Sequence, residues 1–254
     1  MELVRYRTIW ISDVHLGTKG CQAKQLHEFL KRTESDTLFL VGDIIDFWAL
    51  RRGSKWTKDH NAILQKILKK SRHGTRVIFI PGNHDEALRE FCGGKFGDIE
   101  IHHDYTHTTA DGKTIFCLHG DYFDMVTRYH KWLADLGDVG YGLLIRLNNS
   151  LNWLRKLFGR DHWSLSAYIK HKVKQAVSYV SDFEESVAKH AKKLNVDMVL
   201  CGHVHFATMT EYHGIKYLNT GDWVESLTAI VEHEDGKLEL IKWNEYEQKT
   251  NGGN

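Results

Sequence analysis

Five short polar clusters contain residue types that bind transition metals, and each follows an apolar run that is typical of a buried strand. The clusters are Asp13-Val14-His15, Gly42-Asp43, Gly82-Asn83-His84-Asp85, Leu118-His119-Gly120 and Gly202-His203-Val204-His205. In an open α/β sheet the strand ends line a common crevice, so clusters that are remote in the sequence can share one site. We therefore expect all five clusters to form a single site.

The donors of this site would be two Asp, one Asn and four His. They are Asp13, His15, Asp43, Asn83, His119, His203 and His205. Mixed oxygen and imidazole donors suit Mn, Fe, Co or Zn, and seven protein ligands are too many for one tetrahedral ion. Two divalent ions that share a bridging carboxylate fit the set better, and Asp43 is the predicted bridge.

Taken singly, the clusters are weak signals. The pair of Asp13 and His15 is also typical of a polar turn, and Gly42-Asp43 is a common turn dipeptide. His203 and His205 would share one face of an extended segment, which suits a metal but is frequent by chance. The ordered set of five clusters, with glycine beside four of them, is what indicates a metal site.

The first half of the chain alternates short apolar runs with amphipathic stretches, which is typical of strands joined by helices in an α/β fold. We predict strands over 8–12, 37–41, 76–80 and 114–118, and helices over 22–32 and 59–72. Further strands are predicted over 198–201, 208–212, 216–219, 227–231 and 238–241, with hairpin turns at His213-Gly214 and Asp235-Gly236.

Between residues 122 and 193 the apolar residues recur at helical spacing and no strand pattern occurs. We predict one domain over 1–254 that carries a helical lid insertion over 122–193. From Tyr141 to Gln175 the insertion holds seven basic residues and one acid. A basic amphipathic helix can contact an anionic membrane or cover an acyl chain, and an equal alternative is a helix pair that packs on the core with a solvated basic face.

The composition excludes several classes of protein. With 42% hydrophobic and 26% charged residues the chain is an ordinary globular protein, and its formal net charge of +1 gives no reason to expect a nucleic-acid partner. The N-terminal residues lack the apolar core of a secretory signal, and the apolar runs are too short to cross a bilayer. The four cysteines show no CxxC spacing, so we expect a cytoplasmic protein with reduced thiols.

The clusters resemble the motifs of the calcineurin-like metallophosphoesterases: D-x-H, GD-x-x-D/E, GNH-D/E, a single His and GH-x-H. Gly42-Asp43-Ile44-Ile45-Asp46 completes the second motif, and the match runs from about residue 8 to 220. The resemblance implies a four-layer αββα sandwich and two bound ions. It assigns one ion to Asp13, His15, Asp43 and His205. It assigns the other ion to Asp43, Asn83, His119 and His203.

The same resemblance implies a mechanism. Two cations about 3.5 to 4 Å apart would activate a bridging water for in-line attack on phosphorus and neutralise charge on the phosphoryl oxygens. In the family the residue matching His84 lies outside the metal shell, where it can donate a proton or hydrogen bond to the departing oxygen. Asp85 or Asp46 could orient an imidazole ring, with a helix-cap or salt-bridge role as the alternative. His84 and Asp85 are the predicted catalytic residues.

The insertion after His119-Gly120-Asp121, together with Gly221-Asp222-Trp223, is similar to the UDP-2,3-diacylglucosamine pyrophosphohydrolases of lipid A synthesis. These cytosolic, membrane-associated, manganese-dependent enzymes split a UDP-linked glycolipid into UMP and a lipid monosaccharide phosphate. The resemblance implies two Mn²⁺ ions, with Fe or Zn as alternatives, and contact with the inner face of the inner membrane. The predicted substrate contacts are Asp121, Asp124, Ser166, Lys170 and Lys174. The last three are four residues apart, so on a helix they would form a polar ridge that could bind phosphate, with an exposed lysine face as the alternative.

Other functions stay open beside this one. That subfamily usually has Arg where this chain has His84, so another small-molecule or phosphoprotein substrate of the same superfamily is the alternative. A non-catalytic scaffold with this fold would have lost metal ligands, whereas all seven are present here. Exposed leucines in the insertion would serve either a lipid or a homo-oligomer.

Overall fold

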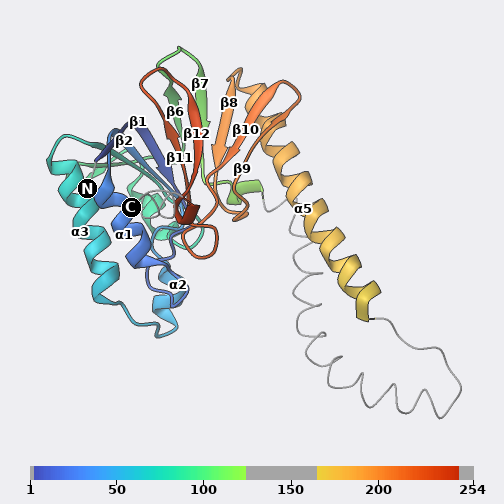
Figure 1. Cartoon of the computed structure of the whole chain (residues 1–254), viewed down its shortest axis with the longest axis horizontal. Coiled ribbons are helices and arrows are strands. Elements are labelled where there is room, and N and C mark those ends of the chain that lie inside the picture. Colours follow the sequence, from blue (N-terminus) through green and yellow to red (C-terminus); the bar gives the residue numbers. More distant parts are fainter. Residues whose placement is uncertain (1–2, 124–164, 246–254) are drawn as a thin grey trace, which may run out of the picture. The chain divides into compact units, whose positions relative to one another are not determined.

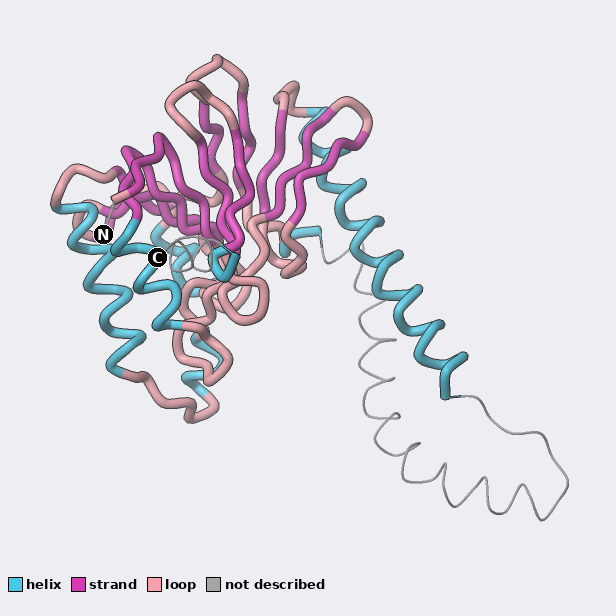
Figure 2. The backbone as a smooth tube through the Cα atoms, viewed as in Figure 1, coloured by secondary structure: helices cyan, strands magenta, loops and turns pink. Residues whose placement is uncertain are grey.

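The computed structural model describes residues 3–123 and 165–245, with the backbone alone over 165–178. The chain divides into two compact units, one formed by residues 1–121 and 187–254 and the other by residues 122–186. The first unit contains two β-sheets with helices beside them, which Figures 1 and 2 show as separate elements. It also contains every polar cluster identified above.

The larger sheet has the strand order β12-β11-β1-β2-β3-β5-β4. Its central strands β1, β2, β3 and β5 are parallel, while β11, β12 and β4 pair antiparallel with their neighbours. The strands are β1 (Val4–Ile11), β2 (Thr33–Val41), β3 (Arg76–Ile80), β4 (Lys95–Phe96), β5 (Ile99–Ile101), β11 (Thr228–Glu232) and β12 (Leu238–Lys242).

The smaller sheet has the order β6-β7-β8-β10-β9, with β7, β8 and β10 parallel and an antiparallel strand at each edge. Its strands are β6 (Tyr105–Thr108), β7 (Thr114–Cys117), β8 (Met198–Cys201), β9 (Thr208–Tyr212) and β10 (Ile215–Asn219). The helices are α1 (Ala23–Arg32), α2 (Phe47–Arg51), α3 (Lys58–Arg72) and α5 (Leu165–Lys193), with 3₁₀ turns η1 (Glu86–Phe91) and η2 (Asp121–Phe123).

Successive side chains of a strand point to opposite faces of its sheet, so each sheet can pack against another layer on either face. Ile9 of β1 packs into the core that the larger sheet shares with α1 and α3, whereas its neighbour Trp10 packs against the smaller sheet. On the outer face of the smaller sheet, the ring of Phe116 lies 6.1 Å from that of His190 in the last turns of α5. The first unit is therefore the predicted αββα sandwich.

The predicted elements agree closely with these bounds. β3 and β8 coincide with the prediction, and the predicted hairpin turns lie between β9 and β10 and between β11 and β12. The left-handed backbone of His213 (φ 55°) and of Gly236 (φ 85°) is typical of such turns. The sequence patterns missed the edge strands β4 and β6, the short strand β5 beside β4, and the five-residue helix α2, because short or exposed segments show no apolar periodicity.

The described part of the predicted insertion is helical, and its last turns, residues 187–193, belong to the first unit. Among the described residues, no helix is both long enough and apolar enough to span a membrane. All four cysteines lie among the described residues, no disulfide joins them, and Cys117 and Cys201 are buried.

Candidate metal centre

The five polar clusters lie together because the strands that precede them run in parallel within each sheet. β1, β2 and β3 end at one edge of the larger sheet, and β7 and β8 end at the matching edge of the smaller one. Hydrogen bonds join the loops that follow, from Asp13 N to Gly42 O (3.0 Å) and from Gly202 N to His119 O (3.1 Å). The predicted convergence of remote clusters is thus present in the structure.

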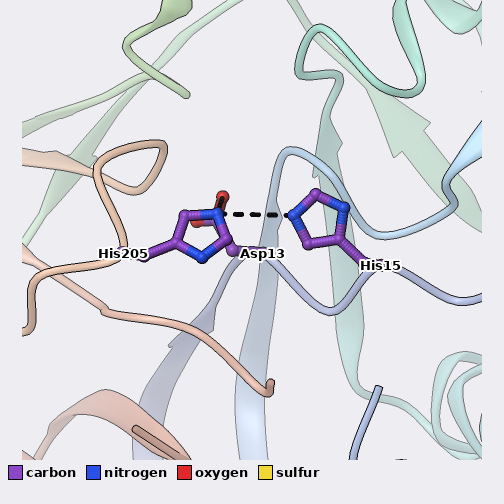
Figure 3. A group of neighbouring side chains, drawn as sticks. All are labelled: Asp13, His15 and His205. Carbon is purple, nitrogen blue, oxygen red and sulfur yellow. Dashed lines mark hydrogen bonds and ion pairs between the residues drawn. The ribbon is translucent and has the colours of Figure 1, made fainter. Parts of the chain in front are cut away.

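One group of donors consists of Asp13, His15 and His205, shown in Figure 3, with one ligand atom of each within 4.8 Å of the others. The Nε2 atom of His205 lies 3.1 Å from Asp13 Oδ1 and 3.4 Å from His15 Nε2. Two imidazole nitrogens and a carboxylate oxygen therefore face one another, which is the arrangement of ligands around a metal ion.

A second group consists of Asp13, Asp43 and His119, again with ligand atoms within 4.8 Å. His119 Nε2 lies 3.5 Å from Asp43 Oδ2, and the ring of His203 lies 5.2 Å from that of His119, centroid to centroid. The two groups share Asp13 and adjoin each other. A third group, His15, Asp46 and His84, meets the same distance criterion beside them.

Among the described residues, two buried atoms of the predicted ligands, Asn83 Oδ1 and His119 Nε2, have no hydrogen-bond partner. A buried polar atom without a partner costs about 1–3 kcal/mol, so such atoms are rare unless something else satisfies them. Cations coordinated by these lone pairs would do so. The residues of the site therefore fit divalent metal ions.

The electrostatics of the site also favour cations. Burial alone would lower the pKa of His119, but the Asp43 carboxylate raises it to about 10. Burial would raise the pKa of Asp43, yet the charge of His119 holds that pKa far below its ordinary value. Burial also opposes ionisation of Asp13, whose pKa is nevertheless lowered by His205 and His119. Two buried carboxylates thus stay ionised and attract positive charge.

Two imidazole rings are held with Nε2 free for coordination. His119 Nδ1 donates a hydrogen bond to the carbonyl oxygen of Val41 (3.0 Å), and His15 Nδ1 donates one to Asp46 Oδ2 (3.2 Å). Because Nδ1 carries the proton in both contacts, each ring in the neutral form that a bound cation requires would present its lone pair on Nε2. Metal-binding histidines are oriented by partners of this kind.

Backbone strain is concentrated at the predicted ligands. Five of the seven have φ in the left-handed region, which costs a residue other than glycine roughly 1–3 kcal/mol and is typical of functional sites. They are Asp13 (50°), His15 (52°), Asp43 (54°), His203 (69°) and His205 (54°).

The glycine before Asp43 is required by its surroundings. A Cβ on Gly42 would lie 2.1 Å from His119 Nδ1, whereas a Cβ on Gly112 would meet nothing within 4 Å. Both glycines have positive φ, 76° and 85°, so either alanine variant carries a similar backbone strain of about 1 kcal/mol. Only Gly42→Ala must also displace His119.

We therefore expect Gly42→Ala to lose bound metal and hydrolytic activity while Gly112→Ala keeps both. Inductively coupled plasma mass spectrometry would measure the effect of each variant on bound metal. Urea unfolding would measure the loss of stability that both variants share through backbone strain. Wild-type metal content in folded Gly42→Ala would show that His119 is not held as described.

His84 lies beside the donor groups. Its Nδ1 atom is 2.9 Å from Asp46 Oδ2, its Nε2 atom is 3.9 Å from Asp43 Oδ2, and its ring is 4.3 Å from that of Trp48, centroid to centroid. Asp46 also accepts a hydrogen bond from Ala49 N (2.6 Å) and so caps α2. Asp46 thus both caps a helix and contacts a histidine ring, the two roles that the sequence left as alternatives. The sequence did not predict the contact between Trp48 and His84.

Asp85 has a different position. Its carboxylate is fully buried and accepts hydrogen bonds from the backbone N–H groups of Gly82 (2.6 Å), Ile44 (2.8 Å) and Ile45 (3.2 Å). Burial and the neighbouring Asp43 charge raise the pKa of Asp85 to about 6. The hydrogen bonds of Asp85 join the loops after β2 and β3, whereas Asp46 is the acid that contacts a histidine ring.

Asp121, a predicted substrate contact, forms an ion pair with Arg89. Arg89 Nη2 donates to both Asp121 carboxylate oxygens (2.8 and 2.7 Å) and to the carbonyl oxygen of Pro81 (3.2 Å), so it joins the loops after β7 and β3. No motif in the sequence signalled this arginine. Asp124 and the side chains of Ser166, Lys170 and Lys174 lie outside the described residues.

Comparison with known proteins agrees with this geometry. The family model of the calcineurin-like phosphoesterases matches residues 6–207, so the chain belongs to that family. It is a metal-dependent phosphoester hydrolase, and its cofactor is a divalent metal.

Curated relatives extend the similarity over most of the chain. The UDP-2,3-diacylglucosamine hydrolase of Neisseria gonorrhoeae is 25% identical over 243 residues, covering 87% of this chain and 92% of that protein. The protein of the same name from Vibrio atlanticus is 23% identical, covering 89% and 93%. A solved archaeal phosphodiesterase is 13% identical with a TM-score of 0.43, covering 92% and 98%.

Proposed function

We propose that this chain hydrolyses the pyrophosphate bond of UDP-2,3-diacylglucosamine to UMP and 2,3-diacylglucosamine 1-phosphate. The observation that supports this substrate is the extent of the chain's similarity to hydrolases of that name. The unaligned 13% of this chain is shorter than the segment 122–193, so the alignment includes part of the predicted insertion as well as the catalytic core.

In the proposed centre, Asp43 would be a ligand of both cations. Asp13, His15 and His205 would complete the ligands of one cation, and Asn83, His119 and His203 those of the other. Asp43 Oδ2 lies 3.9 Å from His15 Nε2 and 3.5 Å from His119 Nε2, so it faces one histidine of each set. When bound, the ions would neutralise phosphoryl charge and lower the pKa of water, and we propose Mn²⁺, with Fe or Zn as alternatives.

The chain's own catalytic group in this proposal is His84. Asp46 holds the Nδ1 side of the ring, and Trp48 packs against it, which leaves the Nε2 edge on the side of Asp43. From there Nε2 can donate a hydrogen bond to a phosphoryl oxygen or to the departing oxygen as negative charge develops. Asp85 supports this arrangement by fixing the backbone of the loops after β2 and β3.

The rest of the proposal concerns substrate and location. Asp121, Asp124, Ser166, Lys170 and Lys174 are proposed to contact the substrate, and the basic segment 141–175 to contact an anionic membrane at the cytoplasmic face. Seven basic residues against one acid in that segment support the membrane contact. Association of two copies through the same segment is the alternative.

Release of UMP tests the substrate. We expect the Mn²⁺-loaded chain to release UMP from UDP-2,3-diacylglucosamine, followed by liquid chromatography, and His119→Ala to release none above background. The same preparations would be assayed with bis(p-nitrophenyl) phosphate and p-nitrophenyl phosphate. Turnover of these aryl esters without UMP release would establish another phosphoester as the substrate and overturn the proposal.

A further inference from the structure

Arg89 joins two loops that each carry a proposed metal ligand. It lies in the 3₁₀ turn η1, which follows the loop of Asn83, and its Nη2 atom donates a hydrogen bond back to the carbonyl oxygen of Pro81 (3.2 Å). The same Nη2 atom donates to both carboxylate oxygens of Asp121 (2.8 and 2.7 Å), two residues after His119. One nitrogen atom therefore holds the loop of Asn83 against the loop of His119.

These two loops follow strands of different sheets, so no strand pairing sets the distance between them. The loop over 81–85 follows β3 of the larger sheet, and the loop over 118–121 follows β7 of the smaller one. The hydrogen bond from His119 Nδ1 to Val41 O connects His119 to β2 and leaves the loop after β3 unattached. Between described residues, no hydrogen bond other than those of Arg89 joins the two loops directly.

The two proposed ions differ in how much they depend on this distance. One ion would take Asp13 and His15 from a single loop after β1, where their separation is fixed within the loop. The other ion would take Asn83 from the larger sheet and His119 from the smaller. Asn83 Oδ1 and His119 Nε2 are buried without a hydrogen-bond partner, so their approach to a shared ion depends on where the two loops lie.

We propose that Arg89 is a positioning residue for the metal ion assigned to Asn83, His119 and His203, and that it acts by fixing the distance between the loops after β3 and β7. The inference rests on the proposed function, because that assignment belongs to the proposed centre. A guanidinium repels cations, so its charge alone would make metal binding stronger when it is removed. Positioning predicts weaker binding of one ion, and the sign of the change separates the two effects.

Mn²⁺ binding to the full chain without substrate tests the proposal. The metal-free protein would be titrated with Mn²⁺, and the free ion measured by electron paramagnetic resonance. Arg89→Ala removes the side chain, whereas Arg89→Met removes the guanidinium and keeps an aliphatic stem that preserves packing. We expect each variant to bind one Mn²⁺ with wild-type affinity and the other roughly tenfold more weakly, the lower end of the range for residues that orient a metal ligand.

The same spectra supply a second readout. At a Mn²⁺ concentration that fills both sites of the wild type, the bound ions should give the signal of a magnetically coupled pair. Arg89→Ala and Arg89→Met should give the signal of an isolated Mn²⁺ at that concentration. A general loss of stability would not convert one signal into the other.

Arg76→Ala is the matched control. Arg76 also donates two hydrogen bonds to a carboxylate, that of Glu100 (2.9 and 2.8 Å), and a third to the hydroxyl of Tyr105 in the smaller sheet (2.8 Å). It lies at the start of β3, at the opposite end from the metal ligands. Arg76→Ala should bind both ions normally. Arg89→Lys restores a positive N–H donor on a shorter side chain and should recover part of the lost affinity.

Two ligand variants identify which ion depends on Arg89. His205→Ala removes a ligand of the ion that does not involve Asn83, and His203→Ala removes a ligand of the ion that does. Adding Arg89→Met to His205→Ala should weaken the remaining Mn²⁺ roughly tenfold. Adding it to His203→Ala should leave the remaining Mn²⁺ unchanged.

The outcomes are distinguishable from those of the proposed function. Wild-type or tighter binding of both ions by Arg89→Ala and Arg89→Met with wild-type circular dichroism would overturn the proposal, as would equal weakening of both ions or an equal effect of Arg76→Ala. If Arg89→Ala does not fold, Arg89→Met decides alone. A wild type that binds fewer than two Mn²⁺ refutes the dinuclear centre and this inference with it. A wild type that binds two but releases no UMP refutes only the substrate.

Discussion

Asp43→Ala is expected to release both metal ions and to reduce phosphoester hydrolysis by roughly a thousandfold or more, since the ions supply several kcal/mol of transition-state stabilisation. The reason is the position of Asp43, whose Oδ2 atom faces His119 Nε2 at 3.5 Å and His15 Nε2 at 3.9 Å. Removing this carboxylate leaves the buried imidazoles without the negative charge that offsets a cation. Metal content and hydrolysis of bis(p-nitrophenyl) phosphate are the measurements.

Asp46→Ala is the matched control, because Asp46 is an acid of the same segment that contacts only the Nδ1 side of His15 and His84. We expect it to keep its metal and to lose roughly 10- to 100-fold in activity, as for other residues that orient a metal ligand. Loss of the α2 cap should lower the free energy of unfolding by about 1 kcal/mol. Equal losses of metal in the two variants would show that Asp43 is not the bridge.

His84→Ala is expected to keep both metal ions while kcat falls roughly 10²- to 10³-fold, the usual cost of removing a donor that stabilises developing negative charge. The ring is positioned for this role, since Asp46 lies 2.9 Å from Nδ1 and the Nε2 edge is on the side of Asp43. Metal analysis and steady-state kinetics with UDP-2,3-diacylglucosamine and with the aryl diester would be made on the same preparation.

Trp48→Phe is the control for this variant, because it keeps an aromatic ring against His84 and should change kcat only a few-fold. A His84→Ala protein that had lost its metal would place His84 among the ligands and contradict its assignment outside the metal shell. An unchanged kcat would show that the ring has no part in the reaction.

The central fold was predictable because its signal is local. β1, β2 and β3 are buried on both faces and give continuous apolar runs, while α1 and α3 repeat apolar residues at helical spacing. The short strands β4 and β5 have no such signal, because their pairing depends on neighbours that the local sequence does not reveal.

The candidate site was predictable in its residues but less so in their contacts. The convergence of the clusters follows from parallel strands, and the glycine beside Asp43 follows from the close approach of His119. Whether Asp46 or Asp85 orients a ring depends on loop geometry, as does the pairing of Arg89 with Asp121. Neither follows from residue type or spacing, because each joins loops that are remote in sequence.

Metal content of the wild-type chain tests the central claim most directly. The protein would be purified without chelator, reconstituted with Mn²⁺, freed of unbound ions and analysed by inductively coupled plasma mass spectrometry. Two Mn²⁺ per chain are expected, with hydrolysis lost on chelation and restored by Mn²⁺. A chain that holds no metal, and whose hydrolysis does not respond to added Mn²⁺, would contradict a dinuclear centre built from these five loops.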